Sequence, residues 1–357
     1  MNTLAGGLFF SLLCLLTAGL SGALLSHVGM PLGWFFGALL SAALLQRYRP
    51  AWRIHDAVRD LARITLGVLI GASFAPDIFS RLAQFWLLTP LVLLYTGGML
   101  LVGSGFFRRY AHFDRRTAFF SAIPGGLTEM LTFSTQVGAD TRAIVVTHLT
   151  RFVVIMAGIS LISSIAERPA AFAAVPATPL TLTGAGWLLA CGLAGGLMAR
   201  ALRIRLGLLL FPLLLSAGVH AAGLTTAASS PALLALCQMV IGLVSGSKLG
   251  GLRQGSTRDL LVAAGFWALL LFVLTLAAAA GATTLMDQSL LTLLLAVIPG
   301  GITEISVLAL ALGADMTLVM TAQLSRQVGI LLFIQLFLHR MAASPTAGGQ
   351  PPGGKQP

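Results

Sequence analysis

The sequence is short of charge, and especially of acidic residues and lysine. Only 9% of its 357 residues are charged and 57% are hydrophobic, whereas soluble domains carry about 25% charged residues. This shortage excludes an ordinary soluble domain. Many of the apolar runs approach the roughly 20 residues with which a helix crosses a bilayer. The sequence therefore predicts an all-α integral membrane protein.

Patterns that bind metals or nucleotides, or that form disulfides, are missing as well. The three cysteines lie singly within apolar runs, and the six histidines show no HxH, HxxH or HExxH spacing. Neither a dinucleotide-binding glycine motif, a P-loop nor a nucleophile elbow occurs. These motifs carry the usual metal, nucleotide and hydrolase chemistry. We therefore expect no cofactor and no metal, and we predict that the protein is not an enzyme.

What the sequence does contain is one heptapeptide that occurs twice. Ile-Pro-Gly-Gly-Leu-Thr-Glu at 123–129 returns as Ile-Pro-Gly-Gly-Ile-Thr-Glu at 298–304, shifted by 175 positions. The same shift places the Gly-Ala-Asp triplet that ends at Asp140 on the triplet that ends at Asp315. A long match at a constant shift indicates an internal duplication.

The duplication covers nearly the whole chain. Further matches at the same shift are the glycine pairs Gly67, Gly71 and Gly242, Gly246. Each pair is a small-xxx-small face that is suited to close helix packing. The sequence thus predicts a first transmembrane repeat at 1–170 and a second at 176–343. The Pro- and Gly-rich tail at 344–357 is expected to be disordered.

The distribution of arginine predicts how the two repeats are related. Arginines cluster in the loops at 47–59 and 108–116, whereas the equivalent stretches at 222–234 and 283–291 contain neither lysine nor arginine. Loops that are basic in the second half align with nearly bare loops in the first. Because basic loops stay in the cytoplasm, this alternation indicates that the halves are inverted.

Inversion also limits the number of membrane crossings. It requires an odd number of crossings per half, yet each half has six apolar segments, so one segment in each half must fail to cross. The motif segment is the best candidate, because the break allows a re-entrant hairpin. The competing interpretation is a broken helix that crosses, with some other segment failing to cross. We expect two inverted repeats of about five spans plus one broken or re-entrant helix each. Both termini should then be cytoplasmic, in a bacterial inner membrane.

The repeated motif predicts the working site. Proline and two glycines interrupt a helix and lead into a carboxylate within apolar sequence. At membrane depth such a break is tolerated only against protein or a water-filled cavity. The motif residues that we predict to bind substrate or ions are Pro124, Gly125, Gly126, Thr128, Glu129, Pro299, Gly300, Gly301, Thr303 and Glu304. The alternative is that Glu129 and Glu304 only cap the helices that follow the breaks.

Arg151 and Arg326 belong to the same predicted site. Each lies eleven residues after the aspartate of its triplet, about three turns into a helix. At that depth each arginine needs a carboxylate, a carbonyl or an anionic substrate as its partner. A structural ion pair with Glu129 or Glu304 and a role in binding substrate carry equal weight.

Three further polar residues have structural roles in this interpretation. Asp140 and Asp315 follow Gly-Ala at apparent helix starts, where an aspartate is an ordinary N-cap. His148 has no histidine counterpart, because Gln323 occupies the equivalent position. We therefore interpret His148 as a polar packing residue.

The doubled motif with its trailing Gly-Ala-Asp resembles the membrane AbrB family, which is described as an AbrB duplication. The resemblance extends over the chain except for the tail and implies a transporter. Members have also been labelled ammonia monooxygenase or regulators of gene expression. An oxygenase would need copper or iron ligands that these residues do not supply. A regulatory role would have to be indirect, because no DNA-reading motif is present.

These patterns predict a secondary transporter of a small anionic solute that works by alternating access and is coupled to H⁺ or Na⁺. Its partners would be the lipid bilayer, the solute and the coupling ion, without nucleic acid, and a homo-oligomer is left open. The alternative is a membrane sensor that affects gene expression indirectly. A membrane metalloenzyme has less support.

The inverted arrangement makes a topological prediction. Reporter enzymes fused at about residues 112 and 287, which occupy equivalent loops, should report opposite sides of the membrane. The measurement is the activity of a periplasm-dependent and of a cytoplasm-dependent reporter at each site. The same side for both fusions would mean that the repeats are parallel.

Overall fold

The protein is helical throughout the part of the chain that the structure describes. The computed structural model describes residues 2–30, 32–49, 52, 54–73, 88–125, 127–165, 181–204, 206–227, 230–249 and 258–342, and these contain no strand. The all-α prediction is confirmed. The predicted tail at 344–357 lies outside the described residues.

The helices follow the predicted apolar segments in order, and each motif segment forms two short helices. The helices of the first half are α1 (Asn2–His27), α2 (Gly33–Leu45), α3 (Asp56–Gly71), α5 (Leu88–Tyr110), α6 (Arg115–Ala122), α7 (Leu127–Gln136) and α8 (Thr141–Ile165). Those of the second half are α9 (Leu182–Ala201), α10 (Gly207–Ala221), α11 (Pro231–Leu249), α12 (Arg258–Ala282), α13 (Leu290–Val297), α14 (Ile302–Ala311) and α15 (Met316–Ala342).

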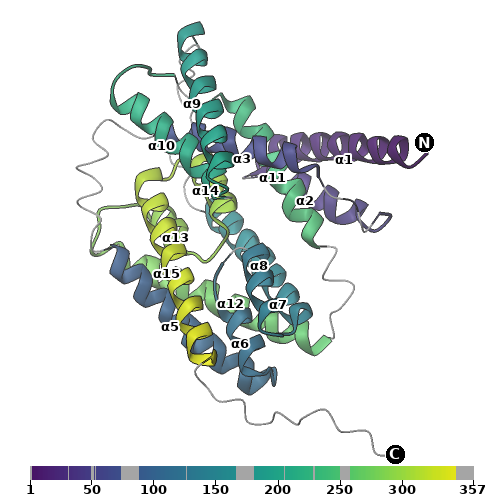
Figure 1. Cartoon of the computed structure of the whole chain (residues 1–357), viewed down its shortest axis with the longest axis vertical. Coiled ribbons are helices and arrows are strands. Elements are labelled where there is room, and N and C mark those ends of the chain that lie inside the picture. The colour runs from purple at the N-terminus through teal and green to yellow at the C-terminus, as the bar shows by residue number, and fades with distance from the viewer. Residues whose placement is uncertain are drawn as a thin grey trace, which may run out of the picture.

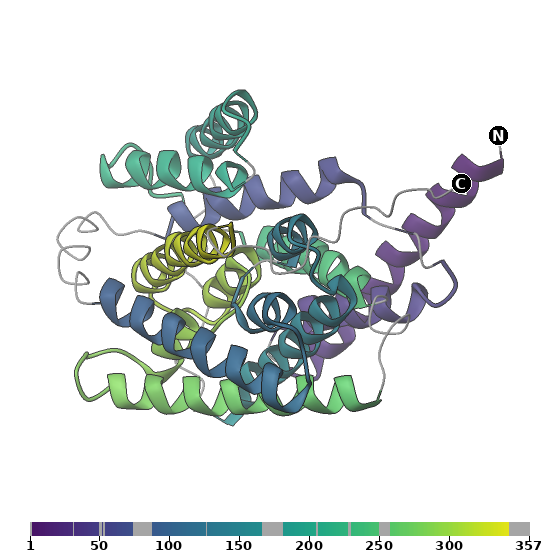
Figure 2. The same ribbon diagram turned by 60° about the horizontal axis from the view of Figure 1, so that its bottom comes forward.

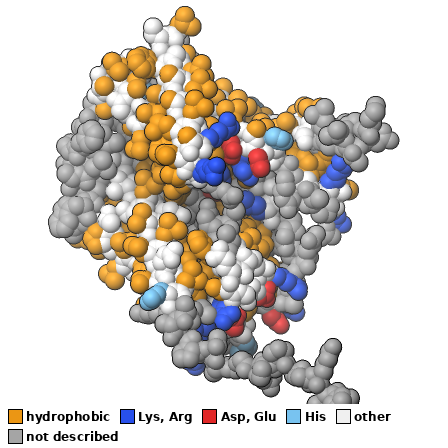
Figure 3. All heavy atoms as spheres, viewed as in Figure 1, with side chains coloured by type: hydrophobic (Ala, Val, Ile, Leu, Met, Phe, Trp, Pro, Cys, Tyr) orange, Lys and Arg blue, Asp and Glu red, His pale blue; other side chains and the backbone are white. Residues whose placement is uncertain are grey.

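Seven of the described helices are long and apolar enough to cross a membrane, namely α1, α5, α8, α9, α11, α12 and α15. Helices α2, α10 and α14 are apolar but shorter. Large hydrophobic side chains are exposed along several long helices, as at Leu20 of α1 and Phe266 of α12, and hydrophobic atoms cover much of the face in Figure 3. The chain is a multi-pass membrane protein. That each half has about five spans stays a prediction.

The described helices gather into two bundles, and both halves of the chain contribute to each (Figure 1). The six-helix bundle contains α1, α2, α3, α9, α10 and α11, and within it α2 packs on α11 and α3 on α10. The eight-helix bundle contains α5 to α8 and α12 to α15, and within it α8 packs on α12 and α5 on α15. In Figure 2 the layers run from α9 and α10 through α3 to α15, and then to α5 and α12. Helix α14 contacts α3 and α11 and so joins the bundles.

Glycines allow the two halves to interlock in the six-helix bundle. Gly67 and Gly71 of α3 lie against backbone carbonyls of α10, and Gly242 and Gly246 of α11 lie against backbone carbonyls of α2. A methyl group at any of these positions would collide with the carbonyl oxygen that it faces. The small-xxx-small faces seen in the sequence therefore pack closely, each on a helix of the other half.

Equivalent helices of the two halves also make equivalent contacts. Helix α1 packs on α2 as α9 packs on α10, and α6 and α7 pack on α8 as α13 and α14 pack on α15. These pairs agree with a duplicated chain. The inverted orientation of the two halves stays a prediction.

Candidate functional site

Both copies of the motif break a helix at the predicted place. Helix α6 ends at Ala122 and α7 begins at Leu127. In the second copy α13 ends at Val297 and α14 begins at Ile302. The predicted interruption of the helix is thus confirmed in both copies. The physical cause is the Pro-Gly-Gly stretch, which cannot continue a helix.

Hydrogen bonds between the ends of each motif segment show that it turns back on itself. Thr117, in the first turn of α6, accepts a hydrogen bond from the Asp140 backbone N–H at 2.9 Å. Thr292, in the first turn of α13, accepts one from the Asp315 N–H at 3.3 Å. The two ends of each segment therefore lie side by side. Each copy is a helical hairpin, which is the geometry expected of the re-entrant alternative; its place in the membrane stays a prediction.

The starts of the hairpin helices are fixed by side-chain caps at equivalent positions. The Asp114 carboxylate accepts hydrogen bonds from the Arg116 and Thr117 N–H groups, at 3.0 and 3.3 Å. Ser289 Oγ accepts one from the Thr292 N–H at 3.2 Å. These caps satisfy donors that a helix start leaves free and set where each hairpin begins.

The tip of each hairpin lies beside the middle of a long helix. Arg151 is ten residues beyond the first residue of α8, a helix of 25 residues, and so about 15 Å along it. Its Nη1 donates to the carbonyl of Ile123, the last residue before Pro124, at 3.2 Å. Arg326 holds the same position on α15 and donates to the equivalent carbonyl, that of Ile298, at 2.5 Å. Ile123 and Ile298 are fully buried.

Arg326 closes the second hairpin by bonding several backbone carbonyls. Beyond Ile298, its Nη1 donates to Val297 O at 3.4 Å and its Nη2 donates to Gly300 O at 3.1 Å. Nη2 also donates to Oε1 of Gln323. The side chain is 2% exposed. The Val297 and Ile298 carbonyls end α13, where unpaired acceptors and the negative end of the helix dipole favour a cation. Of the three expected kinds of partner, carbonyls are the ones found.

Arg151 makes fewer contacts in the first hairpin. Its bond to Ile123 O is the one hydrogen bond to a described residue, although the side chain is only 5% exposed. Close to it in sequence, His148 is 4% exposed and its Nδ1 donates to Ile144 O at 3.0 Å. The Nε2 atom of His148 is buried and has no hydrogen-bond partner among the described residues.

Glu304 does not pair with Arg326. Its carboxylate lies 3.6 Å from Nζ of Lys248, the last basic residue of α11. The two side chains are 16% and 32% exposed. The structural ion pair considered for Glu304 and Arg326 is therefore wrong. Lys248 lies on α11 and faces the motif.

The sequence around Lys248 explains why it faces the second hairpin. Cys237, Ile241, Ser245 and Lys248 recur every three or four residues and so share one face of α11. Cys237 Sγ donates to Ala62 O of α3 at 3.9 Å, and Ile241 is buried in the main core. This face is thus turned toward α3 and α14. The buried Ser245 hydroxyl on it has no partner among the described residues.

Glu304 also sits where a capping carboxylate would. It lies in the first turn of α14, whose N-cap is Gly301, and its carboxylate lies against the position that a Cβ of Gly301 would occupy. Pro299 is buried, whereas Gly300, Gly301 and Thr303 are partly exposed. The second copy therefore presents a mostly buried carboxylate at a helix N-terminus, which agrees with both the capping and the binding hypothesis.

The first copy is described in part. Pro124 and Gly125 are buried beside the α6 terminus. Gly126 lies outside the described residues, and so do the side chains of Thr128 and Glu129. The roles predicted for these three residues stay predictions.

Asp140 and Asp315 are N-caps, as predicted. The Asp140 Oδ1 accepts from the Arg142 and Ala143 N–H groups at 2.9 and 3.2 Å. The Asp315 Oδ1 accepts from the second and third residues of α15 at 2.9 and 3.2 Å. Across the described part of the chain, no three His, Cys, Asp or Glu side chains gather as metal ligands would.

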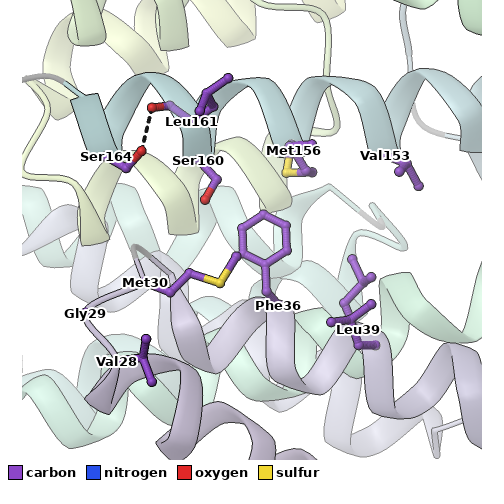
Figure 4. Close-up of a pocket in the computed structure, with 12 residues that line it drawn as sticks. Val28, Gly29, Met30, Phe36, Leu39, Val153, Met156, Ser160, Leu161 and Ser164 are labelled. Carbon is purple, nitrogen blue, oxygen red and sulfur yellow. Dashed lines mark hydrogen bonds between the residues drawn. The ribbon is translucent and has the colours of Figure 1, made fainter.

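A pocket of about 700 Å³ opens away from the motif, between the α1–α2 turn, α2 and α8 (Figure 4). Apolar side chains such as Phe36, Leu39 and Met156 line it. Its hydroxyl groups belong to Ser160 and Ser164, and the latter donates to Leu161 O at 2.7 Å. The lining carries no charge, so this pocket does not suit an anion.

Comparison with known proteins places the chain among relatives of similar length. It matches the family described as "Transition state regulatory protein AbrB" over residues 34–342. It is 26% identical over 343 residues to "Uncharacterized protein YhjN" of Bacillus subtilis (strain 168), which covers 88% of this chain and 89% of the relative. It is 26% identical over 329 residues to "Putative regulator AbrB" of Escherichia coli (strain K12), with coverage of 90% and 93%. No solved structure matches the chain.

The carbonyl contacts of Arg326 predict a stabilising role. Arg326→Met removes a donor from the buried carbonyls of Val297 and Ile298 and from the partly exposed carbonyl of Gly300, and each buried loss costs about 1–3 kcal/mol. We expect a large fall in the melting temperature of the purified protein, measured in detergent by intrinsic fluorescence. The control is Arg109→Met at an exposed arginine, which should change the melting temperature little. Equal melting temperatures for both variants would show that the carbonyl contacts do not hold the hairpin.

Proposed function

This chain belongs to the membrane AbrB family, and we propose that it is a secondary transporter. In this proposal it moves a small anionic solute by alternating access, coupled to H⁺ or Na⁺, and catalyses no reaction. The arginine-rich loops favour cytoplasmic termini in the inner membrane of a bacterium. The partners are the lipid bilayer, the solute and the coupling ion, without nucleic acid, and a homo-oligomer is left open.

The observation that supports transport most is the pair of helical hairpins. Each tip places irregular backbone and a buried arginine about 15 Å along a long helix, which is half of a hydrocarbon core of about 30 Å. Irregular backbone at that depth is tolerated where it lines a cavity or is buried in protein. Transporters build solute and ion sites from helices that are broken at this level.

The charges near the hairpins favour an anionic solute. Arg151, Arg326 and Lys248 are cations next to the breaks, and the described carboxylate at the second break is Glu304. The N-termini of α7 and α14 also begin at the breaks, where free N–H groups and the positive end of the dipole attract negative charge. A small anion would lower the electrostatic cost of this excess of cations.

The Lys248–Glu304 pair offers a coupling step. Lys248 belongs to the six-helix bundle and Glu304 to the eight-helix bundle, so their ion pair joins the two bodies at the motif. A proton or Na⁺ on Glu304 would release Lys248, and an anion could then take the place of the carboxylate. Alternating access would follow from a shift of one bundle against the other around the hairpins.

The name of the Escherichia coli relative introduces a second candidate, regulation. In this candidate the protein would affect gene expression indirectly, by changing the amount of a solute in the cell or by sensing it. An effect on expression that survives the loss of all flux would favour sensing over transport.

The coupling role of Glu304 predicts a specific defect. Glu304→Gln keeps the shape of the side chain and removes its charge, so proteoliposomes should lose the dependence of flux on pH or Na⁺ while solute binding persists. Flux can be followed with an entrapped pH-sensitive dye after addition of chloride, sulfate, phosphate, acetate or succinate. Binding is measured as the rise in melting temperature.

Asp315→Asn is the matched control for this experiment. It also neutralises a carboxylate at a helix start, and Asp315 caps α15 by accepting hydrogen bonds from the Thr317 and Leu318 N–H groups. We expect it to lower the melting temperature by a few degrees without changing the pH or Na⁺ dependence of flux. If Glu304→Gln behaves like Asp315→Asn, Glu304 is a cap and the proposed coupling fails.

A further inference from the structure

The two buried arginines have different neighbours one turn earlier on their helices. Position 148 on α8 is histidine, and its counterpart on α15 is Gln323. Both residues precede a buried arginine by three positions, and side chains three apart lie on the same face of a helix. The two pairs are therefore equivalent in place but different in chemistry.

In the second hairpin, Gln323 and Arg326 are hydrogen-bonded to each other and to backbone carbonyls, and we call this pair closed. Gln323 Nε2 donates to Leu295 O at 2.8 Å, and its Oε1 accepts from Arg326. Both terminal nitrogens of Arg326 are engaged, since Nη1 and Nη2 also donate to backbone carbonyls. An amide can do this because it carries a donor and an acceptor together. An incoming anion would have to break existing hydrogen bonds.

In the first hairpin, His148 and Arg151 make fewer hydrogen bonds to described residues, and we call this pair open. Arg151 has one hydrogen bond to a described residue, and the Nε2 of His148 has none, although both side chains are at least nine-tenths buried. Because the Nδ1 of His148 donates to Ile144 O, the neutral ring carries its proton on Nδ1 and a lone pair on Nε2. His148 also interacts with the Ile123 carbonyl to which Arg151 donates. A buried acceptor is costly unless a ligand or a proton satisfies it, and a proton on Nε2 could be donated toward that carbonyl.

The charges around His148 couple proton binding to anion binding. A proton on Nε2 would put a second buried cation beside Arg151, which like-charge repulsion opposes. An anion at Arg151 removes that opposition, so each ligand favours the other. We propose that His148 and Arg151 form an oxyanion-binding site in the first hairpin, which takes up one proton together with a carboxylate-, sulfate- or phosphate-type anion.

Arg326 of α15 is close enough to Arg151 for like-charge repulsion, whereas few charges on the helices packed against α8 reach this site. Helices α6 and α12 carry charge only in their exposed first turns, and α2 carries none. The one titratable residue of α7 is Glu129, which would be a second acceptor for the proton. The remaining charged residue of α8 is Arg142, in its first turn. The inference deepens the proposed anion transport and rests on it, but binding can be measured without flux.

The test uses His148→Gln, which copies the closed arrangement of the second hairpin and so should fold. In purified wild-type protein, at least one of sulfate, phosphate, acetate and succinate should raise the melting temperature at matched ionic strength. In weakly buffered solution the same anion should cause uptake of about one proton per anion bound. In His148→Gln the affinity should fall about tenfold or more, and the proton uptake should disappear.

Gln323→His is the matched control, because it makes the same exchange in the hairpin that Arg326 closes. It should keep at least the anion response and the proton uptake of the wild type, because Arg326 still donates to three backbone carbonyls. A larger proton uptake than in the wild type would mean that the exchange has opened the second hairpin as well. Equal proton uptake by wild type and His148→Gln would overturn the site, as would anion binding by wild type without proton uptake. Failure of all four anions to stabilise the wild type would overturn it as well. If His148→Gln does not fold, the proton count of the wild type still decides.

The binding and flux results separate this inference from the proposed function. Binding with proton uptake in the absence of any flux would remove the transporter proposal and leave the site standing. Flux that His148→Gln leaves unchanged in rate and pH dependence would remove the site and leave the transporter standing.

Discussion

The structure depends on one constraint, which is that polar backbone groups freed inside a membrane must find partners. Pro-Gly-Gly interrupts a helix twice and leaves carbonyls at the ends of α6 and α13 where no water competes for them. Arg151 and Arg326 supply the donors from the middle of the next long helix. The arginines are in turn tolerated at that depth because the carbonyls are there. Break and arginine therefore stabilise each other, and each hairpin is held at its tip.

The two halves of the chain are assembled by mixing their helices in both bundles. Each bundle draws helices from both halves, so neither half buries its own apolar faces alone. Glycines on α3 and α11 permit this by bringing each helix against the backbone of a helix from the other half. Helix α14 then contacts α3 and α11, and the Lys248–Glu304 pair forms at that junction. The carboxylate of the second motif thus lies where the two bundles meet.

Much of this arrangement could be predicted from sequence, because local chemistry decides it. The helices, both breaks and the caps Asp140 and Asp315 follow from apolar length, from Pro-Gly-Gly and from aspartate at a helix start. Hydropathy could not separate a hairpin from a crossing helix, because both have the same apolar residues. The partners of Arg326 and Glu304 depend on tertiary packing. Lys248 is 56 residues from Glu304 and aligns with Ser73, so the repeat gave no signal for their pairing.

The central claim, that the motif turns back within the membrane, can be tested by labelling single cysteines. Arg115→Cys and Gln136→Cys mark the two exposed ends of the first hairpin, in a chain whose three native cysteines are replaced. A membrane-impermeant maleimide is applied to whole cells and to inverted vesicles. The account predicts that both positions are labelled from the same side of the membrane. Labelling of the two positions from opposite sides would contradict it, because the segment would then cross the bilayer.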